Sequence, residues 1–128
     1  MRLLLDTQIV LWALTGSARL GAMAHDLIAD PGNEIYVSTA SIWEIAIKHA
    51  LGRGQMPVSG ARAAELCAAA GYRELPVAWR HAVVVETLPP LHADPFDRIL
   101  VAQATAAPMR LLSRDATVAS YGASVMAV

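Results

Sequence analysis

The hydrophobic positions of this chain fall into short unbroken runs that alternate with stretches of helical spacing. The first run, residues 3–5, is three consecutive leucines and is typical of a strand buried on both faces. Residues 34–38 are rich in strand-forming side chains, and residues 109–112 and 124–127 favour two further strands. A short strand is also expected at residues 74–77.

Helical segments separate these strands. The spacing predicts helices over residues 7–14, 21–29, 39–51, 59–70, 78–87 and 95–106, with a short helix between the last two strands. Strands that alternate with helices predict an α/β fold with a central, mostly parallel sheet of four to five strands flanked by helices. No repeat or linker interrupts the 128 residues, so we expect one domain spanning residues 1–128.

The composition limits the classes of function. With 55% hydrophobic and 16% charged residues, the chain is expected to be globular rather than disordered. The formal net charge of −1 gives no general attraction to nucleic acid, so any such binding needs local basic residues or metal ions. The single cysteine, Cys67, excludes an internal disulfide and a cysteine-rich zinc site, and its Ala-rich surroundings predict a buried thiol. Without a signal peptide or an apolar stretch of about 20 residues, we expect a cytoplasmic protein without a membrane span.

Four acidic residues lie at or near predicted strand ends, each within apolar sequence: Asp6, Glu44, Asp97 and Asp115. The carboxyl ends of parallel strands share one edge of a sheet, where ligands bind, so these acids are expected to meet in space. Carboxylates without His or Cys partners suit a hard divalent cation, Mg²⁺ or Mn²⁺, which would relieve their mutual repulsion. The pattern therefore indicates metal-dependent phosphoryl transfer.

Helix capping is the competing interpretation of the same acids. Asp6, Asp94 and Asp115 suit N-caps, and Glu44 forms a capping-box spacing with Ser41. Capping alone, however, does not require an acid at nearly every predicted strand end. Because Asp94 precedes a proline, we expect it to cap its helix and Asp97 to face the ligand.

Four segments of the chain carry a family resemblance. They are Leu3-Leu4-Leu5-Asp6-Thr7, Ser41-Ile42-Trp43-Glu44-Ile45, His92-Ala93-Asp94-Pro95-Phe96-Asp97-Arg98 and Leu112-Ser113-Arg114-Asp115. Together they resemble the PIN domain, and more narrowly the VapC-type toxins of bacterial toxin–antitoxin pairs, over essentially the whole chain. The resemblance implies a single PIN-like domain and a Mg²⁺- or Mn²⁺-dependent ribonuclease. In that reading Asp6, Glu44, Asp97 and Asp115 hold the metal and act in catalysis.

The candidates for RNA binding are Lys48, Arg53 and Ser113. Lys48 lies one helical turn after Glu44, which suits either an internal ion pair or a cation for an RNA phosphate. Arg53 stands between two glycines, where it suits either a solvated loop or a grip on the RNA backbone. Ser113 matches a small polar residue that the resembling family often carries.

The histidines are given smaller roles. We expect His92 to orient the loop before Asp94, with proton transfer as the alternative. The other three, His25, His49 and His81, are expected on helix surfaces because they lack zinc-ligand spacing.

The segment over residues 9–14 is apolar on most helical faces, so it is either buried or meets a partner. The resemblance implies a homodimer and a cognate antitoxin that lays a helix or an extended segment into a hydrophobic groove. Trp12, Trp43 and Ile47 are the candidate groove residues.

Other classes of protein fit the sequence less well. A PIN-like scaffold without activity remains an alternative, although all four acids are present. A phosphatase of the haloacid dehalogenase type requires a second Asp where Gln8 stands. A receiver domain requires an acceptor Asp at the end of a middle strand, where this chain has none.

Overall fold

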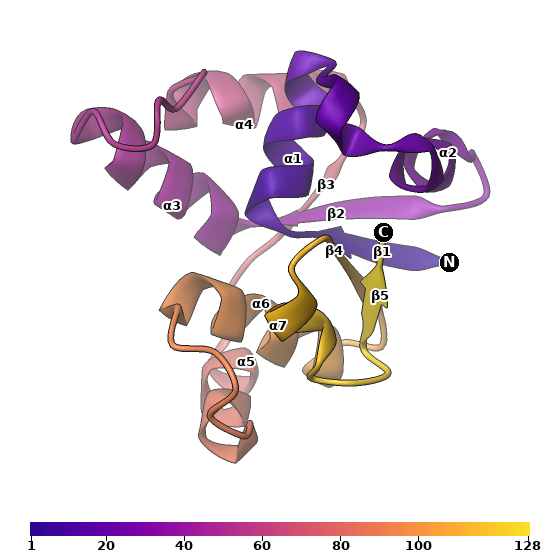
Figure 1. Ribbon diagram of the computed structural model, residues 1–128, viewed down its shortest axis with the longest axis vertical. Helices are drawn as coiled ribbons and strands as arrows, with labels where there is room; N and C mark the ends of the chain where they lie inside the picture. Colours follow the sequence, from indigo (N-terminus) through magenta and orange to yellow (C-terminus); the bar gives the residue numbers. More distant parts are fainter.

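A computed structural model describes residues 1–128 as a parallel sheet between two layers of helices (Figure 1). The strands are β1 (Arg2–Leu5), β2 (Glu34–Ser38), β3 (Arg73–Leu75), β4 (Arg110–Ser113) and β5 (Val125–Ala127). All four pairings are parallel and the order is β3-β2-β1-β4-β5. The α/β prediction with a parallel sheet is confirmed.

Seven α-helices and two 3₁₀ turns connect the strands. They are α1 (Thr7–Thr15), η1 (Ala18–Leu20), α2 (Ala22–Ala29), α3 (Thr39–Ala50), α4 (Gly60–Ala69), α5 (Trp79–Val84), η2 (Val85–Thr87), α6 (Pro95–Ala106) and α7 (Ala116–Ala119). In Figure 1, α1, α2 and α4 lie on one side of the sheet and α5, α6 and α7 on the other. None of these helices has both the length and the apolar character that crossing a membrane demands.

The central strand β1 explains the unbroken leucine run. Leu3 and Leu5 pack on the α1 side against Ile9 and other apolar residues, whereas Leu4 packs on the α6 side against Leu100. Neighbouring side chains of a strand point to opposite faces, and both faces of this sheet are covered. Asp6 follows directly, so burial of the leucines fixes the place of that acid.

The third strand, Arg73–Leu75, begins one residue earlier and ends two residues earlier than the expected strand at residues 74–77. It pairs with β2 in a register that sets Tyr36 opposite Arg73 and Ser38 opposite Leu75. Pro76 follows at once, and proline lacks the N–H that a ladder hydrogen bond needs. The strand therefore ends where the proline stands.

Helices α3 and α4 approach closely at Gly60, the first residue of α4. A Cβ atom at this position would lie 2.7 Å from Cβ of Ala46 and 3.2 Å from its Cα. Only a residue without a side chain fits such an approach. This contact fixes α3, the helix that carries Glu44.

The expectation that His81 lies on a helix surface is wrong, since the side chain is buried between α5 and α6. Its Nδ1 accepts a hydrogen bond from the backbone N of Ala78 at 3.0 Å, so the ring caps the start of α5. Gln103 of α6 lies beside it, with Nε2 at 3.4 Å from Nδ1. A histidine whose acceptor nitrogen is satisfied by the chain can be buried without metal. His25 and His49 are exposed, as expected.

Candidate metal centre

The predicted acids meet in one cavity at the carboxyl ends of β1 and β4 and the starts of the helices that follow. The cavity holds about 390 Å³ and is lined by Asp6, Thr7, Gln8, Leu11, Trp12, Glu44, Lys48, Met56, Asp94, Asp97, Arg114 and Asp115. These residues come from five separate segments of the chain. Parallel strand ends at one edge bring them together, as the sequence led us to expect.

Helix capping and clustering coexist in these acids. Asp6 Oδ1 accepts from the backbone N of Ile9 at 3.0 Å and caps α1. Asp94 Oδ1 accepts from Phe96 N at 2.8 Å and caps α6, as expected. Asp115 Oδ1 accepts from Thr117 N at 2.8 Å and caps α7. The starts of three helices therefore face the cavity and fix its acids by backbone hydrogen bonds.

Glu44 is not part of a capping box, because α3 begins earlier than that interpretation requires. Ser38 caps this helix by accepting from Ala40 N at 3.0 Å, and Ser41 Oγ instead accepts from the hydroxyl of Thr7 at 3.0 Å. This hydrogen bond ties α3 to the start of α1. It places Glu44 one turn further on, facing the cavity.

The carboxylate of Glu44 is buried, and one of its oxygens has no partner within the chain. Lys48 Nζ donates to Oε2 at 2.5 Å, while Oε1 is buried without a hydrogen bond. A buried oxygen without a partner costs on the order of 1–3 kcal/mol, more when it is charged. Oxygen donors in this acidic setting are the ligands that Mg²⁺ and Mn²⁺ prefer, so the residues present fit such an ion.

The electrostatics of the cavity favour a cation. Burial raises the pKa of Asp97 to about 7, and the nearby charges of Asp94, Asp6 and Glu44 add to this, while His92 opposes it. Burial also raises the pKa of Asp6, against the hydrogen bond from Ser113 and the backbone hydrogen bonds. Both shifts show carboxylates that lack compensating positive charge in the folded protein.

Ser113 is placed to hold the acids and not to touch a substrate. Its side chain is fully buried at the end of β4. The hydroxyl donates to Asp6 Oδ2 at 2.6 Å and accepts from the backbone N of Asp115 at 3.1 Å. The expected substrate-binding role does not fit this burial, because both hydrogen-bonding functions are engaged within the chain.

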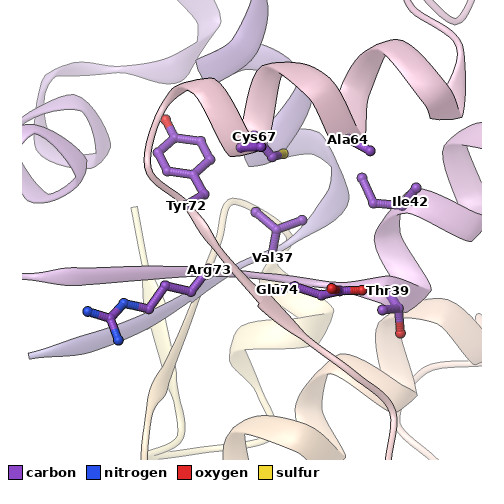
Figure 2. A pocket seen from close by; sticks show the side chains of 9 residues that line it. Val37, Thr39, Ile42, Ala64, Cys67, Tyr72, Arg73 and Glu74 are labelled. Atoms are coloured by element: carbon purple, nitrogen blue, oxygen red, sulfur yellow. The ribbon is translucent and has the colours of Figure 1, made fainter.

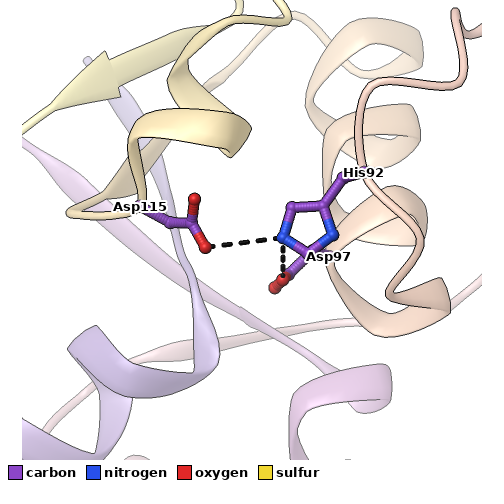
Figure 3. Close-up of side chains that lie close together, drawn as sticks. All are labelled: His92, Asp97 and Asp115. Atoms are coloured by element: carbon purple, nitrogen blue, oxygen red, sulfur yellow. Dashed lines mark hydrogen bonds and ion pairs between the residues drawn. The ribbon is translucent and has the colours of Figure 1, made fainter.

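His92 lies closer to the acids than a loop-orienting role requires (Figure 3). Its Nε2 lies 3.1 Å from Asp97 Oδ2 and 3.4 Å from Asp115 Oδ2, and Figure 3 shows the ring edge directed at both carboxylates. The hydrogen bond from the backbone N of Asp94 to Nδ1, at 3.0 Å, also fixes the loop as expected. Hydrogen bonds from His92 and from the start of α7 outweigh the effect of burial and hold the pKa of Asp115 below its usual range.

The basic residues differ in whether their side chains have partners within the chain. Lys48 lines the cavity and pairs with Glu44, so both interpretations of this residue stay open. Arg53 is exposed and is not part of the cavity lining. The guanidinium of Arg98 donates hydrogen bonds to Val85 O and Pro89 O, both at 3.1 Å, and to the Tyr121 hydroxyl at 3.0 Å.

Arg114 is the second basic residue of the cavity lining. It donates to the backbone O of Arg19 and lies 5.5 Å from the ring centroid of Trp12. These two contacts hold the guanidinium at the rim of the cavity. The stacking also covers Trp12, which is half-buried.

The three candidate groove residues do not share one surface. Trp12 lines the acidic cavity. Trp43 is 62% exposed and lines a separate apolar cavity of about 440 Å³, where its ring packs edge-on against Phe96 at 5.3 Å. Ile47 is half-buried and lines neither cavity.

A third cavity of about 280 Å³ lies between α3, α4 and the edge strand β3 (Figure 2). Cys67 and Ala64 of α4 face Val37 of β2 and Ile42 of α3 across it. The thiol of Cys67 is free and buried, which confirms the expected buried cysteine, and this burial raises its pKa. This cavity is mostly apolar, with Thr39, Arg73 and Glu74 at its edge, and none of the four predicted acids lines it.

The sequence match defines a family. The model of the PIN domain matches residues 3–123. None of the curated proteins matches the sequence.

Solved structures of low sequence identity share the fold. The crystal structure of VapBC2 from Rickettsia felis, bound to a DNA fragment from its promoter, has a TM-score of 0.72 at 11% identity. The alignment covers 100% of this chain and 98% of the VapBC2 chain. FitAcB from Neisseria gonorrhoeae has a TM-score of 0.63 at 19% identity, covering 93% and 91%. A toxin–antitoxin complex from Klebsiella pneumoniae has a TM-score of 0.63 at 18% identity, covering 96% and 94%.

Proposed function

The chain belongs to the PIN domain family, a family of nucleases, and on that premise we propose that it is a metal-dependent ribonuclease of the VapC type. The observation that carries the proposal is the buried Glu44 oxygen without a partner, in a cavity that also holds Asp6, Asp97 and Asp115. Such a cluster can hold a divalent cation, and that cation would neutralise charge on the scissile phosphodiester.

The ion would be held by Asp6, Glu44 and Asp97, with Asp115 beside them. A bound Mg²⁺ or Mn²⁺ supplies the polarisation of a water molecule and neutralises charge on the scissile phosphate. The chain prepares the ligands for this task. Ser113 and the start of α1 hold the two oxygens of Asp6, and Lys48 holds one oxygen of Glu44.

The RNA backbone would lie along the rim where Lys48 and Arg114 stand. Lys48 is 39% exposed, so its ammonium group can contact a phosphate without leaving Glu44. Arg53 follows α3 in an exposed turn and would contact a longer substrate. With a net charge of −1, these local cations and the metal ion supply the attraction to RNA.

We also propose a cognate antitoxin as the protein partner and a homodimer as the assembly. The likeness to structures described as VapBC2 and as a toxin–antitoxin complex supports the antitoxin. Trp43 is the best of the three sequence candidates for a protein contact, because it is exposed beside an apolar cavity. Trp12 is covered by Arg114, and Ile47 is only half-exposed.

The test is cleavage of a total-RNA pool and of matched RNA and DNA oligonucleotides by the purified protein, with Mg²⁺, with Mn²⁺ and with EDTA. We expect RNA cleavage that requires the ion and is abolished in Glu44→Gln, which keeps the size of the side chain. Glu65→Gln, at an exposed position of α4, is the matched control and should cleave normally. Metal binding without cleavage of any substrate would contradict the enzyme and favour a binding scaffold. Equal cleavage of DNA would contradict the choice of RNA.

A further inference from the structure

His92 stands outside the acidic cavity but contacts two of its acids. It does not line the cavity, and its side chain is 18% exposed. Its Nε2 reaches Asp97 Oδ2 at 3.1 Å and Asp115 Oδ2 at 3.4 Å. The nitrogen and both carboxylate oxygens lie within 4.8 Å of one another, a spacing at which the imidazole could either bind a metal ion or hold the carboxylates.

The hydrogen bond on the other ring nitrogen distinguishes these roles. The backbone N–H of Asp94 points at Nδ1 over 3.0 Å. A backbone amide can only donate, so Nδ1 accepts, and the proton of the neutral ring is on Nε2. A histidine that binds metal through Nε2 normally donates its Nδ1–H to an oxygen instead. Here Nε2 is the donor, and its hydrogen bond goes to Asp115 Oδ2.

The Nε2–H group of His92 contacts one oxygen of each of the two acids. The start of α7 holds Asp115 Oδ1, and His92 holds Oδ2, so both oxygens of Asp115 are fixed. Asp97 Oδ2 lies 3.1 Å from the same nitrogen, so the imidazole also packs against the second acid. The N–H group thus fixes Asp115, at the start of α7, and lies against Asp97, in the first turn of α6.

The ring itself is fixed from the backbone. The N–H of His92 donates to the Tyr121 hydroxyl at 3.1 Å, and the same oxygen accepts from Arg98 at 3.0 Å. Arg98 also binds two carbonyl groups of the segment before His92. The segment that carries the imidazole is therefore tied to α6, the helix that carries Asp97.

We propose that His92 is a positioning residue of the metal centre, a neutral donor that holds Asp115 by a hydrogen bond and keeps it beside Asp97 from outside the ligand shell of the ion. The inference rests on the proposed function, because it requires that the cavity bind a divalent cation. Loss of a group that orients metal ligands from behind typically weakens metal binding about 10- to 100-fold.

Two substitutions test the roles of the two ring nitrogens of His92 one at a time. In His92→Asn the amide oxygen can replace Nδ1 as the acceptor for Asp94, but no donor reaches the carboxylates. In His92→Gln the amide nitrogen can take the place of Nε2 and donate to them. We would measure Mn²⁺ affinity for both variants from the electron paramagnetic resonance signal of free Mn²⁺, with unfolding in EDTA as the control for folding.

We expect His92→Asn to bind Mn²⁺ about 10- to 100-fold more weakly and His92→Gln to recover most of the affinity. Pulsed resonance spectra of the unmodified protein with Mn²⁺ should show no coupling to a directly bound nitrogen. That spectrum keeps the inference testable even where a variant does not fold. Unchanged affinity in His92→Asn, equal loss in both variants, or a directly bound histidine nitrogen would each overturn the inference.

Asp97→Asn in the same titration separates this inference from the proposed function. If Asp97→Asn loses Mn²⁺ while His92→Asn does not, the metal centre stands and the role of His92 is wrong. If the unmodified protein binds no Mn²⁺, or if Asp97→Asn binds it normally, the proposed metal centre itself is overturned, and the inference falls with it.

Discussion

Replacing Asp97 by Asn should stabilise the metal-free protein, although the residue lies at the centre of the proposed site. The pKa of Asp97 is raised from 3.8 to about 7, so the folded protein binds this proton more tightly than the unfolded chain. Ionisation of Asp97 therefore opposes folding. The penalty is absent below about pH 4, grows as the pH rises towards about 7, and is complete above that value.

The magnitude follows from the two pKa values. A difference of about three between the folded and unfolded states corresponds to about 4 kcal/mol at pH 8. The side chain is only 22% exposed, so solvent screening removes little of it. Asn also loses the favourable interaction of an acid with the first turn of α6, about 0.3–1 kcal/mol. We expect a net stabilisation of slightly more than about 3 kcal/mol at pH 8 that disappears by about pH 4.

The assay is urea unfolding in EDTA at pH values from 4 to 8, with Asp26→Asn as the matched control. The side chain of Asp26 is 82% exposed, so this control should not change the pH dependence. Saturating Mn²⁺ should reverse the order of stability, since an ion at about 1,000 times its Kd adds about 4 kcal/mol to the protein that binds it. A variant that is less stable than the unmodified protein at pH 8 in EDTA would refute the reasoning.

Three further substitutions test the support of the site. Ser113→Ala removes the buried hydrogen bond to Asp6 and should lower the free energy of unfolding, measured in urea, by about 1–3 kcal/mol. An unchanged unfolding midpoint would contradict a stabilising role for this hydrogen bond. Lys48→Ala should weaken RNA binding in EDTA, measured by filter retention, by more than it weakens Mn²⁺ binding; unchanged RNA affinity would leave only the ion pair with Glu44. Gly60→Ala should cost about 1–3 kcal/mol, since its Cβ would lie 2.7 Å from α3; a stable variant would show that α4 can shift freely.

The sequence was most informative where local chemistry and burial agree. Leu3–Leu5 are apolar without alternation, and both faces of β1 are covered. Asp94 precedes a proline at the start of a helix and caps it, as such a pair predicts. Parallel strand ends explain the positions of Asp6 and Asp115 at the ends of β1 and β4, whereas Glu44 and Asp97 reach the same cavity from α3 and α6. These features depend on short stretches of chain or on one general property of the fold.

The features that could not be predicted depend on tertiary contacts. Ser41 does not cap α3, whose N-cap is Ser38, and its hydroxyl instead accepts from Thr7 on another helix, a contact that the sequence does not show. His81 is buried because α5 packs on α6, and the spacing of the sequence does not show that contact. The one available signal for His92 was its place two residues before Asp94, which predicted an ordered loop but not the contacts with Asp97 and Asp115.

The most direct measurement of the metal centre is anomalous diffraction from crystals grown with Mn²⁺. The ion should lie in the cavity at bonding distance from Asp6, Glu44 and Asp97, with the Glu44 oxygen that has no partner in the chain among its ligands. An ion bound elsewhere, or a cavity free of Mn²⁺ at concentrations that support RNA cleavage, would contradict the claim that these acids form the metal centre of a nuclease.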